Sequence, residues 1–267
     1  MPSVSLPVHL LAAVLVATSI AAIAWRAHSL SGSGAFAAII VGTAAMTSGW
    51  RWGALLVLFF ITSSLLSRVR RARREDVTCG IIAKGGTRDA AQVLANGAVY
   101  ALCAVLSVTL EGLASQQLAL AALGALAAAT ADTWATEVGT VFGGMPRSIA
   151  TWRTLPAGTS GAISLHGTVA MVAGATFIAL SAAALGLATS VPLLVIAGIG
   201  GALADSLLGA TVQERRWCAT CERNTECRIH DCGAATVLVG GCVWVNNDGV
   251  NLVATVLGAA IAMLGTT

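Results

Sequence analysis

The chain has 267 residues, of which 57% are hydrophobic and 10% are charged, and its mean hydropathy is +0.83. So little polar surface cannot cover a soluble globule of this length, which excludes a water-soluble enzyme or binding module. When the apolar runs are threaded through a bilayer from an outside N-terminus, every Lys and Arg except Arg51 falls on one side, which the positive-inside rule assigns to the cytoplasm. We expect an integral protein of a bacterial-type inner membrane, or its equivalent, with the N-terminus outside.

A series of apolar runs predicts an all-α fold, a polytopic membrane helix bundle. The runs are residues 6–23, 34–48, 52–66, 90–110, 118–130, 166–188, 192–212, 234–245 and 250–264. A crossing needs about 20 residues and several runs are shorter, so we expect about seven to nine transmembrane helices. The shortest run, residues 234–245, is expected to be a half-span or part of a broken helix.

Residues 1–67 carry almost no ionisable groups inside their apolar runs and are predicted to be anchoring helices. The first run has no Lys or Arg ahead of it and no clear cleavage motif, which favours a retained helix over a signal peptide. The Arg-rich residues 68–74 lack aromatic neighbours and directly follow a predicted span. They are interpreted as a topology anchor on anionic lipid and not as a nucleic-acid patch. Residues 78–267 contain nearly all the unusual polar residues and form the predicted functional core.

A first polar cluster precedes the run that begins at residue 90. Its members are Lys84, Gly85, Gly86, Thr87, Arg88, Asp89, Gln92 and Asn96. Glycines flanked by two cations ahead of a helix N-terminus are typical of a phosphate site. Asp89, Gln92 and Asn96 recur at helical spacing and should share one face of an apolar segment. The alternative is an ordinary turn with an N-cap and solvated charges.

A second polar cluster, residues 131–139, contains two carboxylates. A carboxylate at the centre of a helix in lipid costs about 2.5–3.5 kcal/mol, so Asp132 and Glu137 need partners or a wet position. Their spacing places them about 140° apart on an ideal helix, so they should not face one ligand unless the helix breaks. Metal or phosphate chemistry is one interpretation. A structural salt bridge to Arg147 or Arg153 is the other.

Two later apolar segments carry further oxygen donors. Close helix packing explains the glycines of residues 198–209, but it does not explain Asp205. Asp248 and Asn251 open the last apolar run. Such donors suit Mg²⁺, which takes a few carboxylates and completes its shell with substrate phosphates. Together with Asp132, these three residues are the predicted magnesium ligands.

Hydroxyl side chains beside glycines supply weaker candidates for binding phosphate. Thr159 and Ser160 lie in a Gly-rich loop, and Ser206 follows the buried carboxylate of its helix. Hydroxyls and backbone N–H groups in such loops can contact phosphate oxygens. His166 lies at the entry to a predicted span, where a capping or packing role is as plausible as a catalytic one.

Four of the seven cysteines crowd residues 214–233: Cys218, Cys221, Cys227 and Cys232, with His230 among them. The pattern Cys218-x-x-Cys221 followed by His230-x-Cys232 has donor types and spacing compatible with tetrahedral zinc. Cys227 leaves the choice of ligands ambiguous. Unliganded thiols and a redox role are the alternatives to a structural metal.

Five of these stretches, in order, resemble the transmembrane protein 19 family, also called domain of unknown function 92. They are residues 84–97, 131–139, 158–168, 204–213 and 246–251. The resemblance covers the chain from about residue 10 onward, and the family includes plant phytyl-phosphate kinase. More distantly, residues 132–161 are similar to the signature of dolichol and phytol kinases and CDP-diacylglycerol synthase. Those enzymes commonly have a Lys near the Thr, where this chain has Ala157 and Gly158.

The resemblance implies a membrane-embedded kinase at the cytoplasmic face. A nucleoside triphosphate, with CTP expected and ATP the other candidate, would give its terminal phosphoryl to a prenyl monophosphate such as phytyl or geranylgeranyl phosphate. Mg²⁺ would bridge the phosphates, while Lys84 and Arg88 neutralise the transferred group. A monophosphate is already largely anionic at pH 7 and needs no strong base. An alcohol acceptor would need Asp89, Asp132 or Glu137 to take its proton.

Two other classes of function stay open. A membrane transporter would also bury sparse carboxylates and amides on broken helices, but it predicts two halves of similar hydropathy, which are not evident. A cytidylyltransferase would use the same metal and phosphates and would release pyrophosphate. The expected partners are a prenyl monophosphate, a nucleotide and membrane lipid, without nucleic acid, and the oligomeric state is left open.

Overall fold

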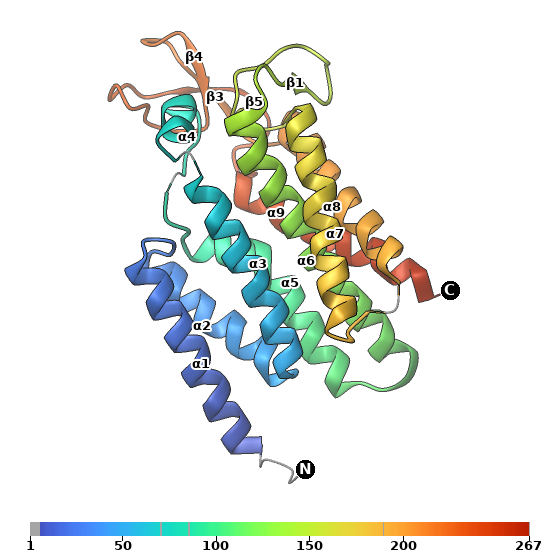
Figure 1. Cartoon of the computed structure of the whole chain (residues 1–267). Helices are drawn as coiled ribbons and strands as arrows, with labels where there is room; N and C mark the ends of the chain where they lie inside the picture. Colours follow the sequence, from blue (N-terminus) through green and yellow to red (C-terminus); the bar gives the residue numbers. More distant parts are fainter. Residues whose placement is uncertain (1–5, 70, 85, 189, 267) are drawn as a thin grey trace.

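A computed structural model describes residues 6–266 except 70, 85 and 189. Its helices are α1 (Leu6–Arg26), α2 (Gly32–Thr47), α3 (Trp50–Arg68), α4 (Arg71–Thr78), α5 (Ala90–Thr109), α6 (Gly112–Phe142), α7 (Leu165–Ala184), α8 (Val191–Thr211) and α9 (Asn247–Met263), which the 3₁₀ turn Leu264–Thr266 follows. Its strands are β1 (Arg147–Ser148), β2 (Ala162–Ile163), β3 (Arg215–Cys218), β4 (Arg223–Thr225) and β5 (Val237–Gly240). Figure 1 shows one helical bundle with α4 and the strands gathered at one end.

The fold is that of an integral membrane protein. Six of the described helices, α1, α3, α5, α6, α7 and α8, are long and apolar enough to cross a bilayer, and α2 and α9 are shorter apolar helices. The predicted all-α bundle of about seven to nine crossings is therefore confirmed. Large apolar side chains such as Phe36, Leu102 and Val169 are exposed on the outer faces, as expected where lipid covers the surface.

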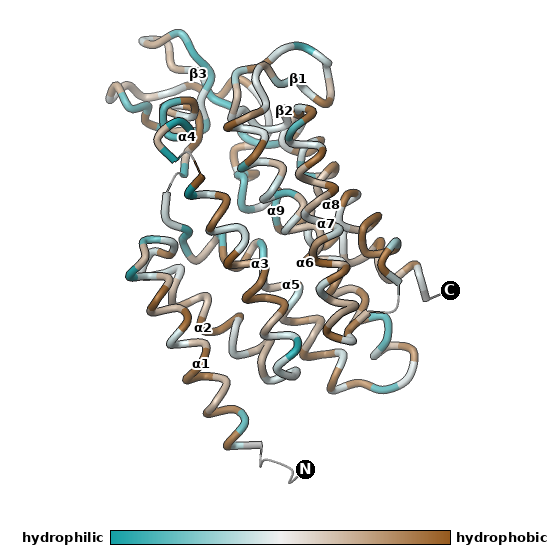
Figure 2. The backbone as a smooth tube through the Cα atoms, viewed as in Figure 1, coloured by the Kyte–Doolittle hydropathy of each residue, from teal (hydrophilic) through white to brown (hydrophobic). Residues whose placement is uncertain are grey.

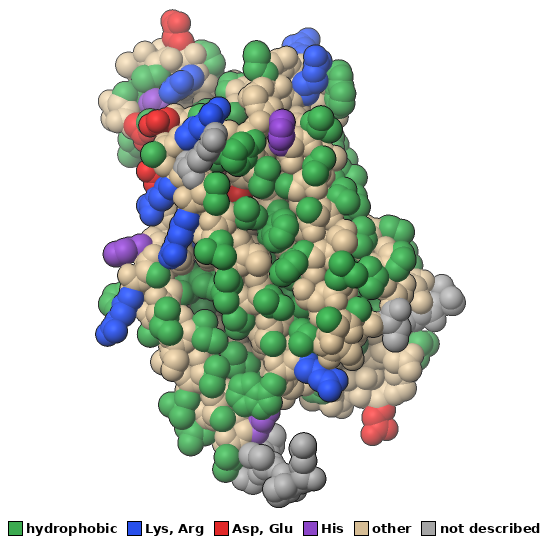
Figure 3. All heavy atoms as spheres, viewed as in Figure 1, with side chains coloured by type: hydrophobic (Ala, Val, Ile, Leu, Met, Phe, Trp, Pro, Cys, Tyr) green, Lys and Arg blue, Asp and Glu red, His purple; other side chains and the backbone are tan. Residues whose placement is uncertain are grey.

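Charged residues and hydrophilic loops are concentrated at the same end of the bundle. In the face shown in Figure 3, hydrophobic atoms cover the flanks and most charged groups lie toward the end that carries the strands. The tube in Figure 2 is likewise most hydrophilic in the loops at that end. Arg51 lies at the opposite end, beside Gly186 in the loop between α7 and α8. We call the strand-bearing end the polar end of the bundle.

Helix α6 is the centre of the bundle and packs against α5, α7, α8 and α9. Residues 121–131 of α6 are all buried, because most are alanines that let neighbouring helices approach closely. Gly124 faces Gly258 of α9, and Gly201 of α8 packs on Ala128. The glycines of α8 thus serve helix packing, as their spacing predicted.

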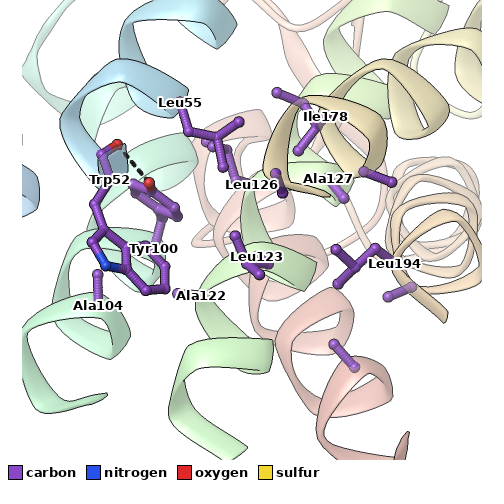
Figure 4. Packing of buried hydrophobic residues seen from close by; sticks show 14 of the residues in the cluster. Trp52, Leu55, Tyr100, Ala104, Ala122, Leu123, Leu126, Ala127, Ile178 and Leu194 are labelled. Carbon is purple, nitrogen blue, oxygen red and sulfur yellow. Dashed lines mark hydrogen bonds between the residues drawn. The ribbon is translucent and has the colours of Figure 1, made fainter. Parts of the chain in front are cut away.

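Larger side chains fill the space between α6 and its neighbours away from the polar end. This cluster includes Leu55, Tyr100, Leu123, Leu126, Ile178 and Leu194, all fully buried (Figure 4). The Tyr100 hydroxyl donates a hydrogen bond of 2.7 Å to the carbonyl oxygen of Trp52. A buried hydroxyl therefore has its partner, and α5 is tied to α3.

Residues 234–245 were predicted wrongly. They form neither a half-span nor a broken helix, but contain β5, which pairs antiparallel with β3, itself paired with β4. The stretch is rich in valine, which suits an extended strand, and it is too short to span lipid. Because the chain does not cross here, α9 begins at the polar end, beside the loops that follow α4, α6 and α8.

The helix that contains residues 118–130 is longer than the apolar run predicted. Helix α6 begins at Gly112 and continues without a break through Asp132 and Glu137 to Phe142. The two carboxylates therefore diverge around one continuous helix, as their spacing predicted for an unbroken one.

Candidate functional site

A cavity of about 860 Å³ lies at the polar end of the bundle. Most of the predicted site residues line it: Lys84, Arg88, Asn96, Asp132, Glu137, Thr159, Ser160, Asp205, Ser206, Asp248 and Asn251. They come from α5, α6, α8 and α9 and from the loops between helices. The fold thus brings together residues that are far apart in the sequence, and we call this space the polar cavity.

Lys84 links the starts of two helices. Its Nζ lies 2.7 Å from Oδ2 of Asp89 at the start of α5 and 2.5 Å from Oδ2 of Asp248 in the first turn of α9. Burial lowers the pKa of Lys84, but the hydrogen bonds to Asp248 and Asp89 outweigh burial and raise it above its ordinary value. The ammonium group therefore stays charged at neutral pH.

Asp89 is the N-cap of α5. Its side chain accepts a hydrogen bond of 3.0 Å from the Gln92 backbone, and the Gln92 side chain accepts one of 3.1 Å in return. Burial raises the pKa of Asp89, but the hydrogen bonds from Lys84 and Gln92 lower it below the usual range. Asp89, proposed from the sequence as a catalytic carboxylate, is not among the lining residues of the polar cavity.

The glycine turn before α5 is only partly in the site. Gly86 has a φ of +85°, a conformation that favours glycine. Neither Gly86 nor Thr87 lines the polar cavity, and Gly85 lies outside the described residues. Because the capping box occupies N–H groups at the start of α5, contacts to phosphate here would depend mainly on Lys84 and Arg88.

The carboxyl groups of Asp132 of α6 and Asp205 of α8 are close enough to interact electrostatically. Neither forms an ion pair with a described Lys or Arg, so the salt bridge to Arg147 or Arg153 that the sequence left open as an alternative is not found at Asp132. The Oδ2 atom of Asp205 is buried without a hydrogen-bond partner. Two carboxyl groups this close share a proton or bind a cation.

Glu137 has the salt bridge that was considered for this helix, but with a different arginine. Its Oε2 lies 3.1 Å from Nε of Arg74, a close ion pair that is not aligned as a hydrogen bond. Its Oε1 accepts a hydrogen bond of 2.7 Å from Ser67. Arg88 donates to Ser64 at 2.9 Å and to Ser67 at 3.2 Å, and burial lowers the pKa of Arg88. Glu137 is thus held in a network between α3, α4 and α6.

The residues of the polar cavity that were missed from the sequence include Gln213 and Glu226. Ser160 donates to Oε1 of Glu226 at 2.5 Å, and Gln213 Nε2 donates to Glu226 at 2.9 Å and to Ser160 at 2.8 Å. Burial raises the pKa of Glu226, and these hydrogen bonds oppose that rise. Gln213 could have been recognised from the sequence, because it ends the motif of residues 204–213. Glu226 lies among the cysteines of residues 214–233, which were interpreted only as possible metal ligands.

Oxygen donors in the polar cavity fit magnesium, although they do not form one closed shell. Asp132, Asp205 and Asp248 do not gather their ligand atoms within 4.8 Å of one another. Besides Asp205, Oδ1 of Asp248 and Oδ1 of Asn251 are buried and have no hydrogen-bond partner. Mg²⁺ keeps several waters and takes one or two carboxylates plus substrate phosphates. The unpartnered oxygens therefore suit a site that substrate would complete.

The cysteine loop brings its predicted ligands together. The donor atoms of Cys218, Cys221, His230 and Cys232 lie within 4.8 Å of one another, the only such group of His, Cys, Asp or Glu among the described residues. Hydrogen bonds from the Ala234 backbone and from His230 lower the pKa of Cys232 to about 6. We call these four residues the cysteine cluster.

A second cavity, of about 90 Å³, adjoins the polar cavity. Apolar side chains of α1, α2, α3 and α5 form most of its wall. It shares Arg88, Gln92, Asn96 and Thr133 with the polar cavity. We call it the apolar cavity. The two cavities meet at a boundary of polar side chains.

Comparison with known proteins gives consistent matches. The sequence model of the family described as "Integral membrane protein DUF92" matches residues 15–259. The chain is 33% identical to Protein PGR of Arabidopsis thaliana over 93% of each chain. It is 30% identical to uncharacterized membrane protein MJ0933 of Methanocaldococcus jannaschii, over 96% of this chain and 94% of the relative. It is 29% identical to chloroplastic Protein VTE6 of A. thaliana, over 88% of this chain and 65% of the relative. No solved structure matches.

Proposed function

We propose, from the premise that this chain belongs to the DUF92 family of integral membrane proteins, that it is a prenyl-phosphate kinase. It transfers the terminal phosphoryl of a nucleoside triphosphate, CTP in our proposal, to a prenyl monophosphate such as phytyl or geranylgeranyl phosphate. The resemblance to a family that includes plant phytyl-phosphate kinase supports this reaction class, as does the 29% identity to Protein VTE6.

The observation that carries the proposal is the contact between the polar and apolar cavities. A prenyl phosphate needs polar space for its phosphate and apolar space for its tail, side by side. Arg88 lies where the cavities meet, and in the described structure it uses two N–H groups for Ser64 and Ser67 out of the five that a guanidinium offers. Its planar fork suits a phosphate. The head group would therefore bind at Arg88, with the first isoprene units among α1, α2, α3 and α5.

The rest of the polar cavity suits the nucleotide. Phosphoryl transfer depends mainly on positioning and on neutralising charge. Lys84 supplies a cation, and Asp205, Asp248 and Asn251 would hold Mg²⁺, which would supply further positive charge to neutralise the phosphates. An oxygen of the acceptor phosphate forms a bond to the terminal phosphorus, and the bond from that phosphorus to the bridging oxygen breaks and leaves a nucleoside diphosphate.

The acceptor oxygen is already largely anionic at neutral pH, so this reaction needs no strong general base. The structure supports a site without one, because Glu137 is ion-paired to Arg74 and Asp89 caps α5. We place the polar cavity at the cytoplasmic face, with the N-terminus outside, because every Lys and Arg except Arg51 falls on one side when the apolar runs are threaded through a bilayer.

The test is a transfer assay on the purified full-length protein in nanodiscs. The reaction contains CTP or ATP labelled in the terminal phosphate, Mg²⁺, and phytyl or geranylgeranyl monophosphate. Label in a lipid diphosphate is the expected result and identifies the nucleotide. Pyrophosphate and a cytidylylated lipid would instead identify a cytidylyltransferase. If folded protein transferred no label with either nucleotide, the kinase proposal would fail, and the buried pair Asp132–Asp205 would direct attention to ion-coupled transport.

A further inference from the structure

We propose that the cysteine cluster is a structural zinc site that holds one wall of the polar cavity in place. Cys218 Sγ and Cys232 Sγ lie 3.7 Å apart, and His230 Nδ1 lies 3.3 Å from Cys232 Sγ. With Zn–S near 2.3 Å and Zn–N near 2.0 Å, a tetrahedral zinc site has S–S edges of about 3.8 Å and S–N edges of about 3.5 Å. These two separations are close to those of a tetrahedral zinc site, and all four donor atoms lie within 4.8 Å of one another.

Two tight turns present these donors. Cys218 ends β3, and Cys221 lies in the turn that leads to β4, where Glu222 has a φ of +50°. In the second turn, the backbone of His230 is hydrogen-bonded at 2.9 Å to Ala234, which brings Cys232 back toward the first turn. Each turn contributes two of the four ligands, the usual way in which a short loop encloses structural zinc.

The fifth residue considered for this site does not join it. The Cys227 thiol instead donates to the carbonyl oxygen of Ile82 at 3.4 Å. A disulfide does not describe the cluster either, because its cysteines are free and the Sγ atoms of Cys218 and Cys232 are 3.7 Å apart, whereas a disulfide bond is about 2.05 Å long. The structure thus resolves the choice of ligands in favour of the four clustered residues.

The zinc loop reaches the polar cavity through its backbone. Glu226, which lines that cavity, donates from its backbone N–H to the carbonyl oxygen of Ile81 at 2.8 Å. Arg223 donates to the Cys79 carbonyl oxygen at 3.4 Å. These contacts dock the loop on the residues that run directly into Lys84. Zinc would therefore act at a distance, as a clip that positions both Glu226 and Lys84.

The test measures metal directly and does not depend on kinase activity. Full-length protein purified without chelator should contain about one zinc per chain by inductively coupled plasma mass spectrometry. Cobalt in place of zinc should show the visible absorption of a tetrahedral thiolate site. Cys218→Ser and Cys232→Ser should lose the metal, whereas Cys227→Ser, a change in the same loop, should keep it. Cys218→Ser should also lower the melting temperature, whereas the turnover of the protein that remains folded should change little.

Two results would overturn the zinc proposal. One is metal-free wild-type protein, from cells grown with added zinc, whose Cys218 and Cys232 are joined in a disulfide by mass spectrometry. The other is equal loss of metal from Cys227→Ser and Cys218→Ser. If the serine variants do not fold, release of zinc from the wild type to a chromogenic chelator, with thiol titration before and after, decides the question. A failed transfer assay would leave this result untouched, since the zinc content is measured without substrate.

Discussion

The first three helices and the part of the chain from Lys84 onward differ in their charged side chains, although hydroxyl groups donate mostly within their own helix in both parts, as Thr130 and Thr211 do in the later one. In α1–α3, hydroxyl groups mostly donate to a carbonyl oxygen of their own helix, as Ser19, Thr47 and Thr62 do. In the later part, key polar groups have partners far along the chain, as in the pair of Lys84 and Asp248. A side chain satisfied within its own helix leaves that helix free to pack against any apolar surface. A side chain that needs a distant partner fixes the relative position of two segments, and this is what builds the polar cavity.

The two parts of the chain are not fully separate, because the C-terminal end of α3 contributes residues to the candidate site. Ser64 and Ser67 bind Arg88, and Ser67 also binds Glu137. The N-terminal helices also form much of the wall of the apolar cavity. The anchoring helices predicted from the sequence thus contribute a second face to the candidate site. Substitutions in each part can separate the two contributions.

The largest effect is expected in the core, at the carboxyl pair. Asp132→Asn and Asp205→Asn should each lower phosphoryl transfer on the order of 10²–10³-fold, because each removes a carboxylate expected to hold Mg²⁺ at the phosphates. The amide has nearly the same shape, so the protein should stay folded. The labelled transfer assay measures the rate, with Glu111→Gln at the exposed N-terminus of α6 as the control. Wild-type rates in both Asp variants would show that the pair is not part of the site.

An intermediate effect is expected in the N-terminal helices. Ala21 is 2% exposed and lines the apolar cavity, so Ala21→Leu should fill that space. We expect KM for geranylgeranyl phosphate to rise about tenfold, which corresponds to ~1.4 kcal/mol, with little change in kcat. Ala22→Leu, on the exposed face of the same helix, is the matched control. Equal KM values for the two variants would mean that the tail binds elsewhere.

The smallest effect on catalysis is expected at Glu137, which joins the two parts. Glu137→Gln should change kcat less than about threefold, because the carboxylate already has Arg74 and Ser67 as partners. It should lower the unfolding free energy by about 1–3 kcal/mol, because it leaves the half-buried Arg74 without its anion. Thermal unfolding, followed by tryptophan fluorescence, measures this loss of stability. The loss is compared with that caused by breaking the exposed pair of Arg71 and Glu75.

Glu75→Gln is the control for that measurement, since the exposed pair should contribute less than about 1 kcal/mol. A loss of transfer in Glu137→Gln as large as that in Asp205→Asn would contradict the structural role and return Glu137 to the catalytic group.

The sequence by itself determined the membrane class, the approximate number of helices and several of the polar residues that line the polar cavity. These features depend on local properties, namely the length of apolar runs, the placement of Lys and Arg, and polar residues that apolar sequence cannot explain. It also indicated the four donors of the cysteine cluster, because ligand spacing in a short loop is a local property as well. It failed at residues 234–245, where a short run of valines suits a strand as well as a helix.

Only the tertiary structure decided which polar groups are partners. It paired Asp132 with Asp205 and Glu137 with Arg74, and it brought Glu226 from the cysteine loop into the polar cavity. It also revealed the apolar cavity beside the polar one. Hydropathy and spacing describe what one helix presents, but a partner is set by the packing of helices that lie far apart in the chain. At the polar end of this bundle, that packing turns scattered carboxylates and cations into one candidate site.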